Sequence, residues 1–268
     1  MGTTKSGKHG LCEKAPVIAM LLTVVIGALP SAGGLIPNPA GYIAISVLSI
    51  VLLILFNMWF KPEFEGVFKA HLPLKEILII TSTMSIMVVG SVISNILCSG
   101  FVIKASFTYL CMAIMAGVNE ETMYRAMIIP VGMRYLKGQH RAWMVIVISS
   151  LVFGPMHLTN IFAGADVGMT LVQTVMATCG GIILGAIYLR TGSVIPGMAA
   201  HALYDFVNFA TDPTINPEGV VIAGVSTNEN LLMIICIVMS VFLGLSGCFL
   251  IRKSKLDVIE EIWRKKWE

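Results

Sequence analysis

Charged residues are scarce in this chain. Only 12% of its 268 residues are Asp, Glu, Lys or Arg, whereas a soluble domain has about 25%. With 56% hydrophobic residues and a mean hydropathy of +0.86, the composition excludes an ordinary soluble globular protein. Apolar runs long enough to span a bilayer recur along the chain. The composition therefore predicts an all-α, polytopic membrane protein.

Cysteine pairs and local metal-binding motifs are also missing. The six cysteines are scattered without a CxxC pair, so they predict small buried hydrophobes and imply neither a disulfide framework nor a zinc ribbon. The polar segment 1–14 precedes an apolar run that is long enough to span, so no cleavable signal peptide is expected. No internal repeat, low-complexity tract or soluble domain is evident, which favours a single integral membrane domain over residues 1–268.

About eight transmembrane helices can be assigned from the apolar runs. They cover roughly residues 15–36, 41–60, 77–97, 105–133, 142–162, 168–189, 194–210 and 230–251. The seventh is short, as is common for a helix that lines a cavity rather than facing lipid. In the tail 256–268, apolar residues alternate with charged ones, which predicts either an amphipathic helix on the cytoplasmic surface or a solvated tail.

The positions of Lys and Arg test this number of spans. With the N-terminus in the cytoplasm, 16 of the 18 fall on the inside, Lys104 falls outside and Arg125 lies within a span. The predicted outer loop 211–229 contains no Lys or Arg. Because cytoplasmic loops of membrane proteins carry an excess of these residues, the pattern supports eight spans with both termini in the cytoplasm.

Six ionisable side chains other than Tyr and Cys fall within the predicted spans. They are Glu120, Glu121 and Arg125 in the fourth span, His157 in the fifth, and His201 and Asp205 in the seventh. Charge at membrane depth is costly, so such residues face the bundle interior and pair with one another. A lone buried glutamate or histidine often only satisfies a neighbour, but six in one chain favour a single functional site.

The spacing of the fourth-span residues divides their roles. Glu121 and Arg125 are four apart and share a helix face, so the arginine can neutralise that carboxylate. Glu120 is rotated by about 100° and can point elsewhere, free for chemistry. A carboxylate with a histidine such as His157 can activate a water, and the polar pair of the seventh span can stabilise an oxyanion. The set is typical of a hydrolase that works within the membrane.

The three motifs resemble the signature of the CAAX protease and bacteriocin-processing (CPBP, or Abi) family of intramembrane endopeptidases. The family pattern is EExxxR, then FxxxH, then HxxxN or HxxxD on three helices. This chain has Glu120-Glu121…Arg125, Phe153…His157 and His201…Asp205, in that order and each in an apolar segment. The resemblance covers about residues 105–210, and it implies that these form the catalytic core.

The resemblance implies hydrolysis of a peptide bond in a membrane-associated protein or peptide. The processing would be of CAAX type, or that of a bacteriocin or signal peptide, with self-immunity as a further role. Glu120 and His157 would activate the water, and Glu121 with the arginine of its motif would shape the site. His201 with Asp205 would form the oxyanion hole.

Asp205 departs from the CAAX-processing branch, which has asparagine there. An ionised aspartate would repel an oxyanion, so Asp205 would be protonated, orient His201 or bind a cation. This favours a bacterial-type member, expected in a bacterial plasma membrane. The sequence leaves open a second interpretation, in which Glu120, His157, His201 and Asp205 bind a divalent metal such as zinc. Since HExxH is absent, a metal-independent glutamate mechanism without a cofactor is expected.

Two other functions would use the same residues. A proton- or cation-coupled transporter could relay protons through the buried acids and histidines, although no inverted repeat is evident. A non-catalytic bacteriocin-immunity protein would bind its partner at the membrane. The expected partners are a membrane-associated substrate and the lipid bilayer, with no nucleic acid, and the sequence leaves the oligomeric state open.

Overall fold

Each of the eight predicted spans is a helix or a run of consecutive helices. The computed structural model describes residues 9–213 and 228–268, and in these ranges it contains helices and no strand, as predicted. Residues 1–8 and most of the predicted outer loop 211–229 lie outside the described part. In chain order the eight segments are α2 and η1 (Pro16–Gly27, Leu29–Leu35), α3 (Ala40–Phe60), α4, η2, α5 and η3 (Leu74–Thr81, Ser82–Met84, Ser85–Ser94, Asn95–Ser99), α6, η4 and α7 (Phe107–Glu121, Thr122–Ala126, Ile128–Tyr135), α8 and η5 (Arg141–Met156, His157–Ala163), α9 (Val167–Thr191), α10 (Ile195–Thr211) and α11 (Glu229–Leu250).

Six of these eight segments are long and apolar enough to cross a membrane by themselves. The other two are the segment of α6, η4 and α7 and the helix α10. The continuous helical stretch 107–126 of α6 and η4 falls short because Glu120, Glu121 and Arg125 lower its hydropathy, and α10 falls short because it has only 17 residues. These two segments carry five of the six predicted site residues. The chain is thus an integral membrane protein whose polar helices are shielded by apolar ones.

Side-chain caps and one glycine set several of the helix boundaries. The side chains of Ser106, Asp166 and Asn228 each accept a hydrogen bond from the backbone N–H three residues later, which starts α6, α9 and α11. Gly192 ends α9 with φ of +73°, a left-handed conformation that a side chain disfavours. None of the six cysteines, all of which the structure describes, forms a disulfide.

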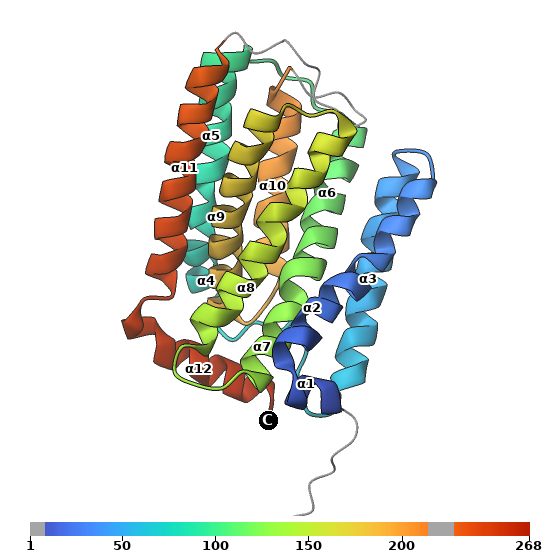
Figure 1. Ribbon diagram of the computed structural model, residues 1–268, viewed down its shortest axis with the longest axis vertical. Coiled ribbons are helices and arrows are strands. Elements are labelled where there is room, and N and C mark those ends of the chain that lie inside the picture. Colours follow the sequence, from blue (N-terminus) through green and yellow to red (C-terminus); the bar gives the residue numbers. More distant parts are fainter. Residues whose placement is uncertain (1–8, 214–227) are drawn as a thin grey trace, which may run out of the picture.

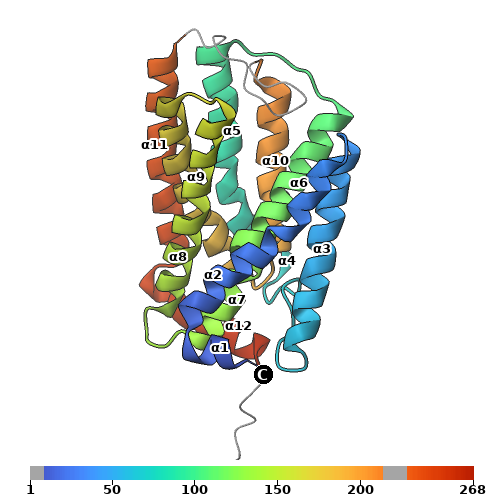
Figure 2. The ribbon, with the colours of Figure 1, turned by 45° about the vertical axis from the view of Figure 1, so that its right-hand side comes forward.

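Most of the long helices run roughly along the long axis of the molecule, and α10 lies between α5 and α6 (Figures 1 and 2). Helix α10 packs against α6 and α5, and α9 packs between α8 and α11. The turn η4 contacts α2, α3, α8 and α9, and all five of its residues are buried. The N-terminal helices α2 and α3 cover the side of the bundle formed by α7 and α6.

A close approach at Gly117 brings the two polar segments together. A Cβ atom at this position would lie 2.7 Å from the Met198 carbonyl oxygen and 2.8 Å from the Ala202 backbone nitrogen. Only glycine therefore allows α6 and α10 to meet at this depth. The contact lies about one helical turn from both Glu120 and His201, so it sets the distance between their helices.

The short helices α1 (Gly10–Lys14) and α12 (Lys253–Lys266) lie together at one end of the bundle (Figure 1). Most of the tail predicted over 256–268 belongs to α12, whose apolar side chains pack against the bundle. Trp263 is buried and its indole N–H donates a hydrogen bond of 3.1 Å to the Leu189 carbonyl. Arg141, at the start of α8, forms an ion pair with Glu260 on α12.

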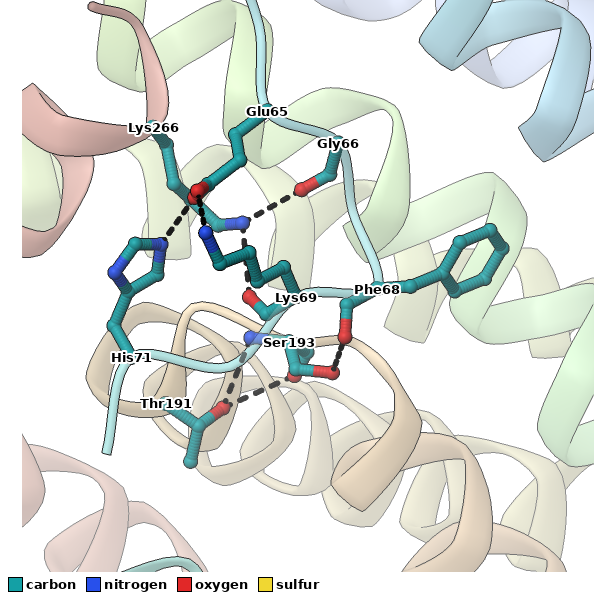
Figure 3. A network of polar contacts seen from close by, with 8 residues as sticks. All are labelled: Glu65, Gly66, Phe68, Lys69, His71, Thr191, Ser193 and Lys266. Atoms are coloured by element: carbon teal, nitrogen blue, oxygen red, sulfur yellow. Dashed lines mark hydrogen bonds and ion pairs between the residues drawn. The ribbon is translucent and has the colours of Figure 1, made fainter. Parts of the chain in front are cut away.

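At this end, a polar network joins α12 to the turn that precedes α10 (Figure 3). The buried Lys266 ammonium donates to the carbonyl oxygens of Gly66 and Lys69, at 2.6 and 3.0 Å. These carbonyls belong to the loop between α3 and α4. The Phe68 carbonyl of the same loop accepts a hydrogen bond of 2.7 Å from the hydroxyl of Ser193, which precedes α10. The loop between α3 and α4 is thus held on one side by α12 and on the other by the start of α10. Burial lowers the pKa of Lys266 to about 8.

Candidate active site

The first motif lies where α6 gives way to the π-helical turn η4. Glu121 is the last residue of α6 and Arg125 lies within the turn. Arg125 Nη1 donates to Glu121 Oε1 at 2.9 Å, and the two side chains are 0% and 1% exposed. The ion pair predicted from the four-residue spacing is therefore present, and it is fully enclosed by the bundle.

His201 of α10 contacts three carboxyl groups. Its Nδ1 lies 3.1 Å from Glu121 Oε1, within hydrogen-bonding distance. Its Nε2 lies 3.7 Å from Glu120 Oε2 and 3.6 Å from Asp205 Oδ2, distances of close ion pairs. The imidazole is therefore held from both sides, and the first and third motifs meet at this ring.

Glu120 does not point away from Glu121 in the way that the 100° rotation suggests. Both glutamates reach the same histidine, because the two ring nitrogens of His201 face different directions and each meets one carboxylate. The two glutamate side chains differ in their solvent exposure. The Glu120 side chain is 32% exposed, whereas that of Glu121 is 1% exposed. The adjacent acids thus share a site but have different surroundings.

His157 joins this cluster through Phe153. It begins the 3-10 segment η5, two residues after Pro155 in the last turn of α8. The Phe153 ring packs edge-on against His157, with ring centroids 5.2 Å apart, and lies 6.3 Å from the His201 ring. His157 also interacts electrostatically with Glu120 and His201. The six residues predicted from the sequence therefore gather in one region.

The guanidinium of Arg125 is enclosed by apolar and small residues as well as by its carboxylate. Its central carbon lies 4.1 Å from the centroid of the Phe153 ring, a cation–π contact. On the other side, a Cβ atom at Gly181 of α9 would come within 3.0 Å of Arg125 Nη2. The phenylalanine of the second motif thus supports the arginine of the first.

Residues 102–207 match the protein-family model described as type II CAAX prenyl endopeptidase, Rce1-like. This segment is thus similar to the Rce1-like family. The resemblance inferred from the three motifs is thereby confirmed, and the family is one of membrane proteases. The Rce1-like segment contains α6 to most of α10, and with them all six predicted site residues. Comparison with curated proteins and with solved structures found no match.

Two supporting contacts of the Rce1-like segment could not be read from the motifs. Asn119, next to Glu120, accepts a hydrogen bond of 3.0 Å from Ser49 Oγ and so ties α6 to α3. Ser149 of α8 donates a hydrogen bond of 2.5 Å to the carbonyl oxygen of Tyr124 in η4. The only signal in the sequence is that each is a small polar residue in an apolar span, where packing is the usual role.

Glu120, His157, His201 and Asp205 are the residues that would bind a metal if the site held one. Among residues 9–213 and 228–268, no group of three or more His, Cys, Asp or Glu side chains is arranged so that it could hold a metal ion. Glu120, His201 and Asp205 are close, but His201 Nε2 makes these contacts at 3.6 and 3.7 Å.

Proposed function

We propose that this membrane protease is a glutamate-dependent intramembrane endopeptidase that hydrolyses a peptide bond of a membrane-associated protein or peptide. One observation carries the proposal: of two adjacent glutamates that contact His201, only Glu120 is accessible, at 32%. Glu121 is buried against Arg125. A water molecule can therefore reach one carboxylate and not the other.

In the proposed reaction, Glu120 is the general base. It takes a proton from a water whose oxygen attacks the carbonyl carbon of the scissile peptide bond, and His157 holds that water from the side of α8. The carbonyl oxygen becomes an oxyanion, to which His201 Nε2 donates. The C–N bond then breaks, and the proton on Glu120 passes to the nitrogen of the leaving amine.

Asp205 and Glu121 position His201 in this proposal. Asp205 Oδ2 lies 3.6 Å from Nε2, and Glu121 Oε1 lies 3.1 Å from Nδ1. Glu121 accepts a hydrogen bond from Nδ1–H and so orients the ring, while Asp205 lies beyond hydrogen-bond distance, favours the protonated ring by its charge and leaves Nε2–H to donate to the oxyanion. Asp205 therefore acts on the oxyanion through the histidine. Arg125 neutralises Glu121, so that the site tolerates several acids in a small volume.

The substrate class follows from the family and the setting. The matched family description names CAAX prenyl endopeptidases, so a farnesylated peptide that ends in a CAAX sequence is the first probe. Cleavage of a bacteriocin or signal peptide is the second, because Asp205 replaces the asparagine of the CAAX-processing branch. In both cases the peptide reaches Glu120 from the membrane.

The test is cleavage of the farnesylated peptide by the purified chain in liposomes. Glu120→Gln should lower kcat by at least about 100-fold, since general-base catalysis contributes roughly that much. The control is Glu229→Gln at the exposed start of α11, which should cleave like the wild type. Full activity of Glu120→Gln would overturn the proposal.

A chelator test separates this mechanism from a metallo-site. Protein shown by metal analysis to hold less than one zinc per ten chains should retain full cleavage after chelation. Loss of activity that added zinc restores would contradict a glutamate mechanism and favour the alternative ligand set of Glu120, His157, His201 and Asp205.

A further inference from the structure

A single side-chain hydrogen bond joins the backbone of the first motif to the helix of the second. The Ser149 hydroxyl of α8 donates to the Tyr124 carbonyl of η4 at 2.5 Å. The two residues are 25 apart in the chain, and both are buried, with Ser149 0% exposed. Tyr124 lies between Glu121 and Arg125, so the bond attaches directly to the motif that forms the buried ion pair.

The carbonyl that Ser149 contacts belongs to the π-helical turn η4. A π turn contains one residue more than an α turn, which widens the helix and disturbs its regular pairing. Within a membrane no bulk water is present to satisfy a displaced carbonyl, and Ser or Thr side chains of neighbouring helices take that role. Ser149 makes such a contact with η4, whose five residues are all buried.

Ser149 shares one face of α8 with Phe153, which follows it by four residues. His157 begins η5 directly after the end of α8. Phe153 contacts the Arg125 guanidinium at 4.1 Å and the Tyr124 ring at 5.0 Å. The hydrogen bond of Ser149 thus fixes the position of α8 along its axis relative to η4. It does so one helical turn before Phe153 and eight residues before His157.

We infer that Ser149 is a positioning residue that sets the register between the helix of His157 and the turn that follows Glu120 and Glu121. The inference rests on the proposed function, because it assigns Ser149 a role in holding the two groups that activate water. Ser149 touches neither group. It acts through the Tyr124 carbonyl on one side and through α8 on the other.

The chain supplies a matched control in the next residue. Ser150 is also buried, at 1% exposure, and its hydroxyl has no hydrogen-bond partner. Ser149→Ala and Ser150→Ala remove the same atom from adjacent positions of α8. In cleavage of the farnesylated peptide, Ser149→Ala should lower kcat by about tenfold or more with KM within twofold, since small misplacements of reacting groups have effects of this size. Ser150→Ala should match the wild type.

Ser149→Cys keeps a weak donor of similar volume and covers the case in which Ser149→Ala does not fold. It should melt like Ser150→Ala while its kcat falls several-fold with unchanged KM, a separation that a purely structural role would not produce. Wild-type kcat in Ser149→Cys and in any folded Ser149→Ala would overturn the inference. That result leaves the proposed function intact as long as Glu120→Gln is inactive, whereas an active Glu120→Gln would refute the proposed function itself.

Discussion

The buried ion pair predicts how the bundle responds to loss of Arg125. Substitution by Met removes the charge but keeps most of the side-chain volume, and it leaves the Glu121 carboxylate at 1% exposure with His201 as its remaining partner. Breaking a buried pair from one side costs about 3–5 kcal/mol, because a charge stays behind without compensation. The lost cation–π contact with Phe153, at 4.1 Å, adds up to about 2 kcal/mol for a desolvated site.

Since His201 compensates part of the stranded charge, the net loss for Arg125→Met should be about 3 kcal/mol. For a chain of this size, a loss of about 3 kcal/mol corresponds to a fall in melting temperature of roughly 6–12 °C. The assay is thermal unfolding of the purified protein in detergent, followed by circular dichroism. The control is Arg264→Met, whose ion pairs with Glu261 and Glu268 are exposed, and such pairs contribute about 0–1 kcal/mol.

A double variant sharpens this prediction. Glu121→Leu combined with Arg125→Met removes both charges, and apolar replacement of a buried pair is often nearly neutral. The double variant should therefore melt above Arg125→Met. Two results would contradict this role of the ion pair. One is that Arg125→Met melts at the same temperature as Arg264→Met. The other is that the fall in melting temperature of the double variant equals the sum of the falls measured for Glu121→Leu and Arg125→Met alone.

Two further predictions concern packing and pH. Gly181→Ala places a Cβ atom 3.0 Å from Arg125 Nη2 and should lower both the melting temperature and kcat. In Gly180→Ala the added Cβ atom meets no atom closer than 3.9 Å, so this variant should behave as wild type. Equal melting curves of the two variants would contradict this packing. Burial lowers the pKa of Lys266 from 10.5 to about 8, so the unfolded chain binds more protons between these values. Unfolding free energy should therefore rise with pH across this window by about 3 kcal/mol relative to Lys266→Met, and denaturant titrations at pH 8 and 10.5 that show no such difference would refute the assignment.

The sequence predicts the spans closely because apolar length is a direct physical requirement of the bilayer. The predicted span 41–60, for example, is the helix Ala40–Phe60, and 194–210 is Ile195–Thr211. The contact of Glu121 with Arg125 could also be predicted, because residues four apart on a helix are neighbours. These features depend on local geometry alone.

The remaining features depend on tertiary contacts that have no sequence period. The π turn at Thr122–Ala126 has the composition of an ordinary helix, so the pattern could not reveal it. The rotation of Glu120 away from Glu121 suggested separate surroundings, but His201 bridges the two acids, and this depends on how closely α10 approaches α6 at Gly117. Convergence of the motifs was predictable from the cost of buried charge. The partner of each atom was not.

The placement of α12 has a spectroscopic consequence. The four tryptophans are Trp59, Trp143, Trp263 and Trp267. Trp263 lies on α12 and Trp267 directly follows it, while Trp59 lies in the last turn of α3 and Trp143 in the first turn of α8, at the end of the bundle that α12 covers. Trp263 and Trp267 are buried, at 1% and 5% exposure, while Trp59 is 59% exposed. Intrinsic fluorescence therefore reports whether α12 is docked, and an inhibitor that binds at Glu120 will need an extrinsic dye to be seen.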